Sequence, residues 1–265
     1  MKTISIANLK GGVGKTITSI NLAYLLAAEH EKRVLIVDND KQGNVSQFFG
    51  RYGYEHAGTG EVMTREYKTP EDVIQHTENP NIDIIAANLS LADAERQVQN
   101  EAGGLPQQLR LKMLLLQVRD RYDFCIIDNA PSIGMCVINA LAASDFLIVP
   151  VKIDRFTFEG LDSLLEQAGE MHVYFNKRLR LLGTLITSYR KNASNVSGEE
   201  WLRQAEKYHV FNQHISYSDK VDESTFSQEP ITVYSKTCGT SWDYRAWTAE
   251  VLVKMAAAEG GKDDE

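Results

Sequence analysis

The chain has 265 residues, of which 43% are hydrophobic and 24% are charged, so it is long enough to bury a substantial core. Its formal net charge of −8 argues against binding nucleic acid through overall positive charge, although it does not exclude a local basic patch. Three cysteines without C-x-x-C spacing, no signal-peptide pattern and no apolar run near the ~20 residues of a membrane span predict a cytoplasmic protein.

Short β-branched and apolar runs alternate with helical patterns along most of the chain. The runs predicted as strands cover residues 3–8, 33–38, 82–87, 123–128, 145–151 and 181–187. Their continuous apolar character is typical of strands that are covered on both faces of a parallel sheet. Helical periodicity predicts helices over residues 15–30, 109–122, 161–175, 198–209 and 241–260. This alternation predicts an α/β fold with a doubly wound, mostly parallel sheet flanked by helices.

The chain shows no internal repeat and no low-complexity linker. Residues 51–80 are weakly patterned and rich in Gly, Thr and Glu, and we expect them to form an irregular excursion within one domain. The predicted organisation is a single domain over residues 1–258, followed by a disordered tail over residues 259–265.

The sequence KGGVGKT, residues 10–16, lies between the first predicted strand and the first predicted helix. A standard Walker A loop, G-x-x-x-x-G-K-[ST], needs a glycine where this chain has Leu9, and the chain carries an additional lysine at Lys10. The glycines of such a loop let backbone N–H groups converge on phosphate oxygens, and the following helix N-terminus adds partial positive charge. Lys15 is placed to reach the β- and γ-phosphates, and the Thr16 hydroxyl is placed to bind Mg²⁺.

Two acidic loops follow later predicted strands. The run VDNDKQGN places Asp38 and Asp40 at a strand end, where ligands gather in open α/β sheets. One of these carboxylates can meet the water shell of a metal ion while the other orients an attacking water. The run YDFCIIDNAPS places Asp128 in a Walker B position, beside a loop that can sense a γ-phosphate.

These strings resemble the deviant Walker A ATPases, and most closely the ParA/Soj branch of partition proteins. The usual strings of that branch are KGGVGKTT, VLLIDLDPQGN and IIDTPPSLG, compared here with KGGVGKTI, VLIVDNDKQGN and CIIDNAPSIG. The resemblance continues through ASDFLIVPVKIDRFTFEGL and EPITVYSKTCGTSWDYRAWTAEVL, and so covers nearly the whole chain.

The resemblance implies a P-loop ATPase that uses ATP/ADP and Mg²⁺. It implies that Lys10 crosses an ATP-sandwich homodimer to touch the phosphates of the partner subunit, and that Asp40 positions the hydrolytic water. Catalytic roles would then fall to Lys10, Lys15 and Asp40, and metal binding to Thr16, Asp38 and Asp128. The expected ATP-binding residues are Lys10, Gly11, Gly12, Val13, Gly14, Lys15, Thr16, Ile17 and, near the adenine, Pro230.

The resemblance also implies partners. Members of the family hydrolyse ATP slowly, are stimulated by a ParB-like adaptor, and bind double-stranded DNA without sequence preference as an ATP dimer. We therefore expect a cytoplasmic, nucleoid-associated protein that partitions a chromosome, plasmid or mobile element, with no membrane partner. Candidates for a basic surface are Arg178, Arg180, Arg190, Lys191, Arg203, Lys207, Lys220, Lys236 and Arg245.

Several departures from the family strings leave alternatives open. Ile17 replaces the second threonine of GKTT, Lys41 replaces a proline, and DNAPS replaces DTPPS. The alternatives are a MinD-like positioning ATPase, partition of a cargo other than DNA, and a nucleotide-gated scaffold that does not hydrolyse ATP. An iron–sulfur ATPase is disfavoured because Cys125 and Cys136 are too far apart to form a ligand pair. Apolar residues of the last helix, including Trp242 and Trp247, are expected to pack on the core rather than on lipid.

Overall fold

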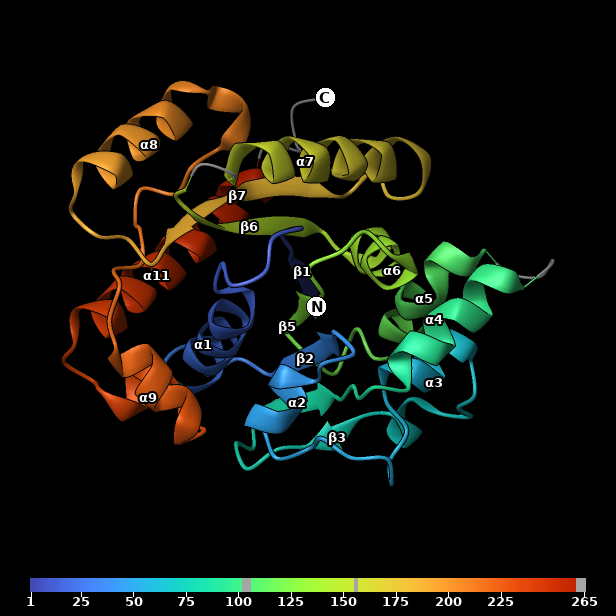
Figure 1. The fold of residues 1–265 in the computed structure, drawn as a ribbon. Coiled ribbons are helices and arrows are strands. Elements are labelled where there is room, and N and C mark those ends of the chain that lie inside the picture. The colour runs from blue at the N-terminus through green and yellow to red at the C-terminus, as the bar shows by residue number, and fades with distance from the viewer. Residues whose placement is uncertain (102–105, 155–156, 261–265) are drawn as a thin grey trace.

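The computed structural model describes residues 1–101, 106–154 and 157–260, and a seven-stranded sheet forms the centre of this part of the chain (Figure 1). The strand order is β3-β4-β2-β5-β1-β6-β7. All strands run parallel except β3, which pairs antiparallel with β4 at one edge. This confirms the predicted doubly wound, mostly parallel sheet. The strands are β1 Lys2–Ile6, β2 Val34–Asn39, β3 Gln75–His76, β4 Ile82–Ile85, β5 Phe124–Asn129, β6 Phe146–Lys152 and β7 Arg180–Thr187.

Helices cover both faces of the sheet. α1 packs against α10 and α11 on one face, whereas α3, α5, α6 and α7 cover the other (Figure 1). The helices are α1 Lys15–Ala28, α2 Asn44–Phe48, α3 Thr59–Thr64, α4 Leu91–Asn100, α5 Arg110–Gln117, α6 Met135–Ala143, α7 Thr157–Tyr174, α8 Ala193–Gln204, α9 Lys220–Phe226, α10 Ile231–Tyr234 and α11 Gly239–Gly260. Short 3₁₀ turns occupy Pro70–Asp72, Gln107–Leu109 and Glu206–Tyr208.

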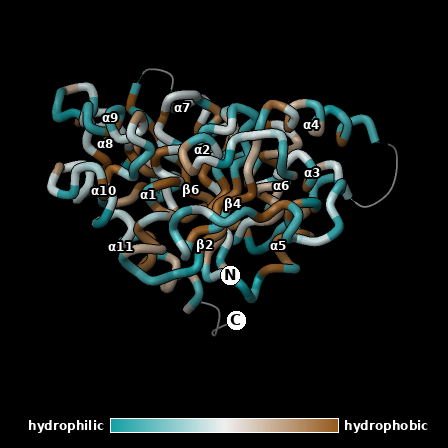
Figure 2. The backbone as a smooth tube through the Cα atoms, turned by 90° about the horizontal axis from the view of Figure 1, so that it is seen from below, coloured by the Kyte–Doolittle hydropathy of each residue, from teal (hydrophilic) through white to brown (hydrophobic). Residues whose placement is uncertain are grey.

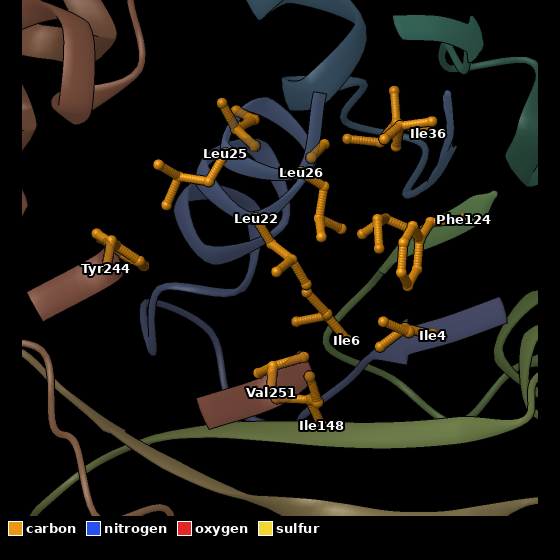
Figure 3. Packing of buried hydrophobic residues seen from close by; sticks show 14 of the residues in the cluster. Ile4, Ile6, Leu22, Leu25, Leu26, Ile36, Phe124, Ile148, Tyr244 and Val251 are labelled. Atoms are coloured by element: carbon orange, nitrogen blue, oxygen red, sulfur yellow. The ribbon is translucent and has the colours of Figure 1, made fainter. Parts of the chain in front are cut away.

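The continuous apolar runs of the strands supply two cores at once, because successive side chains point to opposite faces. Ile36 and Ile126 join the cluster that contains α1 and α11, and Figure 3 shows Ile36 facing Leu26 of α1. Their sequence neighbours Leu35 and Cys125 belong to the cluster that contains α5. The strands accordingly form the hydrophobic centre of the backbone trace in Figure 2.

All six predicted strands are confirmed, with boundaries within three residues of those expected. The stretch 51–80 is more ordered than expected, since it contains α3, a 3₁₀ turn and the edge strand β3. Helix α8 begins at Ala193, earlier than predicted, because the side chain of Asn192 accepts a hydrogen bond from the N–H of Asn195 and caps it. Helices α2, α4, α6, α9 and α10 were not predicted either.

Helix α11 packs on the core along one side, but the expectation that both of its tryptophans would be buried is wrong. Trp247 and Met255 are buried, whereas Trp242 is 59% exposed, because it lies in the first turn on the outer side of the helix. The helix continues to Gly260, and the rest of the expected tail, residues 261–265, lies outside the described residues. None of the helices in the described ranges combines the length and the apolar character that crossing a bilayer requires.

Trp247 anchors α11 to the segment that runs beside β7, because its fully buried ring packs edge-on against Phe211 at a centroid distance of 5.8 Å and the N–H of Phe211 donates to the carbonyl oxygen of Thr184. We predict that Trp247→Ala lowers the free energy of unfolding by about 3–5 kcal/mol, the usual cost of deleting a buried aromatic ring. Urea unfolding followed by circular dichroism measures this loss. Trp242→Ala in the same helix is the matched control and should cost less than about 1 kcal/mol. Equal losses for the two variants would show that the packing assigned to α11 is wrong.

Candidate nucleotide-binding site

Three loops meet at the carboxyl ends of the central strands. Ile6 of β1 pairs in register with Asp128 of β5, and Asp128 pairs on its other side with Asp38 of β2. The loop of residues 10–16 therefore begins beside the two aspartates that the sequence singled out. Figure 1 shows the loop that leads from β1 into α1 at this edge of the sheet.

The glycine-rich loop and the uncapped start of α1 carry backbone N–H donors beside open space. Gly12 and Gly14 adopt φ angles of 71° and 83°, which glycine accommodates without strain. A Cβ built on Gly11 or Gly12 would meet no atom within 4 Å, so there is room above the loop. No side chain caps the N-terminus of α1, and its first turn carries no acidic residue. An anion such as a phosphate fits these backbone donors.

Val13 and Thr187 hold this loop on the sheet. Val13 is buried, and its carbonyl oxygen accepts a hydrogen bond of 2.9 Å from Oγ1 of Thr187 at the end of β7. The same hydroxyl is 3.1 Å from the carbonyl oxygen of Val151 in β6. The loop is thereby anchored on the β7 side by the protein alone.

Lys15 lies inside the loop rather than in solvent. Its side chain is largely buried, and Nζ donates a hydrogen bond of 3.0 Å to the carbonyl oxygen of Lys10. Burial lowers the pKa of Lys15, and the nearby carboxylates of Asp128 and Asp40 partly offset this effect. A phosphate bound in the loop would give this buried ammonium a close counter-charge.

Asp128 joins the loop helix to the sheet. Thr16 Oγ1 donates to Asp128 Oδ2 at 2.9 Å, and Ser19 Oγ donates to Asp128 Oδ1 at 2.6 Å. Burial raises the pKa of Asp128 to about 6, against the opposing effect of these two hydroxyls. Ser19 was not among the predicted site residues. A serine one helical turn after Lys15, on the apolar face of the helix, could have indicated a buried hydrogen-bond partner.

Asp38 is fully buried and organises the loop that follows β2. Its Oδ2 accepts hydrogen bonds from the N–H and the hydroxyl of Ser46, at 2.8 and 2.7 Å, and its Oδ1 lies 3.3 Å from the N–H of Asp40. Burial, with a further contribution from Asp128, raises the pKa of Asp38 to about 7. Asp38 thus holds the start of α2 in place. Asp128, by contrast, is the aspartate that is hydrogen-bonded to Thr16 of the glycine-rich loop.

Asp40 sits half-buried on a tight turn. Its Oδ1 accepts a hydrogen bond of 3.0 Å from the N–H of Gln42, and its carbonyl oxygen accepts one of 2.9 Å from the N–H of Gly43. Lys41, the residue that replaces the family's proline, is exposed on the outside of this turn. The substitution therefore leaves the turn intact and adds a surface charge.

The additional lysine of the loop is held within its own subunit. Lys10 forms an ion pair with Asp154, which lies just past β6, and the Lys10 side chain is 31% exposed. Its N–H donates to Asn8 Oδ1 at 2.9 Å, and Asn8 Nδ2 donates to the carbonyl oxygen of Pro150 at 2.7 Å. Asp154 was not predicted, because nothing in the sequence places the end of β6 beside the glycine-rich loop.

A cavity of about 330 Å³ opens beside Thr16 and Ile17, between α1, α2 and α9. Phe48, Thr225 and Gln228 line its other sides, and Pro230 is not among its lining residues. Pro230 is buried at the start of α10, which packs against α1. Ile17 therefore lines the cavity beside the loop and Pro230 does not, and the expected place of Pro230 near the adenine stays a prediction.

The oxygen donors at the loop suit Mg²⁺ bound together with phosphates better than a metal ion bound by protein side chains alone. Within the described ranges, no group of three or more His, Cys, Asp or Glu side chains is arranged to hold a metal ion. Mg²⁺ usually keeps several waters and binds one or two carboxylates together with substrate phosphates, and the Thr16–Asp128 pair fits that pattern. Cys125 and Cys136 are buried free thiols on different elements, and burial raises the pKa of Cys136 well above its usual value.

The chain is similar to proteins of known family. Residues 1–181 match a family described as an AAA domain. The sporulation initiation inhibitor protein Soj of Bacillus subtilis (strain 168) is 34% identical over 265 residues, with 98% of this chain and 99% of Soj covered. The chromosome partitioning protein ParA of Caulobacter vibrioides (strain NA1000 / CB15N) is 30% identical over 254 residues, with 95% and 94% covered.

A solved structure extends the comparison to a bound ligand. The cobyrinic acid a,c-diamide synthase from Mycobacterium smegmatis, solved with an ATP analog and magnesium, superposes with a TM-score of 0.82 at 25% identity. The match covers 97% of this chain and 96% of that one. The sheet and its helices therefore occur in a protein that holds this type of ligand.

The buried carboxyl of Asp38 predicts a pH dependence of stability. The pKa of Asp38 is about 7 in the folded protein and about 4 in the unfolded chain. The unfolded chain therefore releases this proton more readily, and the folded state loses stability as the pH rises through this interval. We predict that, without nucleotide, the melting temperature of the wild type decreases between about pH 5 and about pH 8. This decrease should exceed the decrease in Asp38→Asn over the same interval by about 3 °C or more. Asp120→Asn, which replaces the carboxylate of a side chain that is 96% exposed by a neutral amide, should leave the profile unchanged. Identical profiles for wild type and Asp38→Asn would be inconsistent with this assignment.

Proposed function

Because the chain belongs to the ParA/Soj family of partition ATPases, we propose that its three loops bind ATP with Mg²⁺ and hydrolyse it slowly. The observation that carries the proposal is the hydrogen bond between Thr16 and Asp128 beside the buried ammonium of Lys15. This arrangement presents a hydroxyl, a carboxylate, a cation and backbone donors at one helix N-terminus. Those are the groups that phosphoryl transfer requires.

The chemistry follows from what each group can do. The backbone donors of Gly11–Thr16 and the ammonium of Lys15 hold the phosphate oxygens and stabilise the charge that develops on them. Mg²⁺, held by Thr16 with Asp128 behind it, would neutralise charge on the β- and γ-phosphates. Asp40, half-buried and anchored by its turn, orients the attacking water. Asp38 keeps that turn in place through Ser46.

Lys10 points to a homodimer as the active form. Its ammonium pairs with Asp154, whereas the ammonium of Lys15 donates to the backbone inside the loop, so Lys15 is the lysine placed for the phosphates of its own subunit. Two triphosphates buried face to face concentrate negative charge, and a lysine from each subunit stabilises the other's phosphates. ATP then acts as a switch that holds two subunits together until hydrolysis releases them.

The biological role that follows is partition of DNA in the cytoplasm. We infer that a ParB-like adaptor stimulates hydrolysis and that the ATP dimer binds double-stranded DNA without sequence preference. Eight of the nine candidate basic side chains are exposed, while Arg203, Lys207, Lys220 and Arg245 are paired with acidic residues. Arg190 and Lys191 follow the carboxyl end of β7, the end at which two subunits would meet, so they can form one surface across a dimer.

Size-exclusion chromatography with ATP and Mg²⁺ tests the switch. We predict that Asp40→Ala elutes as a dimer with ATP and as a monomer with ADP, because it binds ATP but hydrolyses it at least about 100-fold more slowly. Adding Lys10→Ala should abolish the dimer, since this variant removes the cation donated to the partner. Phosphate release from the wild type is the reference. A wild type that hydrolyses no faster than Asp40→Ala would favour the nucleotide-gated scaffold instead.

Salt dependence tests the DNA surface. We predict that binding of the ATP-bound dimer to a random-sequence duplex weakens with salt. Arg190→Ala/Lys191→Ala should make the negative slope of log K against log[salt] shallower, by about 0.9 for each phosphate that the variant no longer binds. Lys32→Ala/Arg33→Ala, two exposed residues just before the amino end of β2, is the control that should keep the slope. Fluorescence anisotropy at several salt concentrations measures both. Unchanged binding in the first variant would exclude this surface.

A further inference from the structure

Two buried asparagines occupy positions where the family strings have other residues. Asn39 lies between Asp38 and Asp40, where the family string VLLIDLDPQGN has a leucine. Asn129 follows Asp128, where the family string IIDTPPSLG has a threonine. The two asparagines are partners in register at the ends of β2 and β5, and each is only 1% exposed. Two departures that are 90 residues apart in sequence therefore meet in space.

Asn39 connects both ends of the loop that follows Asp128. Its Nδ2 donates to Asn129 Oδ1 at 2.8 Å and to the carbonyl oxygen of Cys136 at 2.9 Å. Cys136 lies in the first turn of α6, so residues 130–134 run between the two points that one amide group holds. The backbone of Asn39 leads directly into Asp40. A shift of the 130–134 loop is therefore transmitted to the Asp40 turn.

Asn129 extends the connection to the strand that enters the glycine-rich loop. Its Nδ2 lies 3.2 Å from the carbonyl oxygen of Ile6 and 3.4 Å from Oγ of Ser5, both in β1. It also lies 3.2 Å from the carbonyl oxygen of Ile127 in its own strand. Together the two amides link β1, β2 and β5, the strands whose ends carry the proposed site.

The arrangement carries a cost that simple packing would avoid. Oδ1 of Asn39 is buried and accepts no hydrogen bond from the described residues. An unsatisfied buried acceptor is unfavourable, and an apolar side chain such as leucine would not create one. The position is therefore better explained by the connections that the amide makes than by the stability it provides.

We propose that Asn39 and Asn129 form a positioning pair that makes the Asp40 turn and the 130–134 loop move as one unit. The inference rests on the proposed hydrolysis of ATP at this site. Neither side chain reaches the open space above the glycine-rich loop, so the pair acts through Asp40 and through the loop that faces the γ-phosphate. Such a connection sets the geometry in which water and phosphate meet, to which rate is highly sensitive.

Steady-state kinetics with a matched control test the pair. Asn39→Ala and Asn129→Ala should each lower kcat for ATP by about 10- to 100-fold, because the reacting groups are misplaced, while KM changes by less than about 3-fold. Asn176→Ala is the control. Asn176 is also buried, and it donates to the carbonyl oxygens of Leu141 and Ser144 at 3.0 and 2.6 Å. Its removal should lower the melting temperature but leave kcat unchanged.

Restoring the family residues provides a second readout. Asn39→Leu alone leaves Asn129 Oδ1 without its donor and should remain slow. The double variant Asn39→Leu/Asn129→Thr removes both amides and should be about as slow as the single variants, because either single change already breaks the connection that the two residues share. Decreases of kcat in the two single alanine variants that match that of Asn176→Ala would overturn the proposal.

Hydrogen exchange of the nucleotide-free protein keeps the test independent of hydrolysis. In Asn39→Ala, exchange should rise about 10-fold in residues 129–138 as well as in residues 39–43, because the two segments are coupled. In Asn176→Ala, neither segment should change. A wild type without ATPase activity would refute the proposed function, and exchange alone would then decide the coupling: a rise confined to residues 39–43 rejects it.

Discussion

The structure depends on one buried contact, the carboxylate of Asp128 with the hydroxyls of Thr16 and Ser19. An isolated buried carboxylate is costly, and two hydroxyl donors together with the nearby ammonium of Lys15 make this one tolerable. The same hydrogen bonds orient the first turn of α1 against β5. The start of α1 is therefore held beside the glycine-rich loop by side chains of the protein itself.

The charges around this contact explain why a triphosphate with a divalent cation is the fitting ligand. Asp38 and Asp128 lie at the same level of adjacent strands, and both are protonated more readily than an exposed carboxyl. Lys15 is a buried cation whose pKa is lowered. A divalent cation held by Thr16 and Asp128 would compensate the carboxylate charge, and phosphate oxygens would compensate the ammonium of Lys15, so both sets of groups would be satisfied together. The unfavourable burial of these charges therefore becomes part of the driving force for binding.

The fold and the loops were predictable from sequence because both arise from local patterns. Apolar runs indicated the six strands of the parallel sheet, and GKT after a strand placed Lys15 and Thr16. The connections between loops were not predictable, because Ser46 on Asp38 and Asn39 on Asn129 depend on strand order and register. The same reason hid the pairing of Lys10 with Asp154. Trp242 was misjudged because the sequence alone does not show which side of the first turn of α11 faces solvent.

Isothermal titration calorimetry of ATP binding with Mg²⁺ tests the central claim most directly. We expect a saturable heat for the wild type and an affinity at least about 100-fold lower for Lys15→Ala, since this variant removes the buried ammonium that binds the phosphates. Thr16→Ala should weaken binding only when Mg²⁺ is present. The absence of heat for the folded wild type with ATP and Mg²⁺, or an unchanged affinity in Lys15→Ala, would contradict the account.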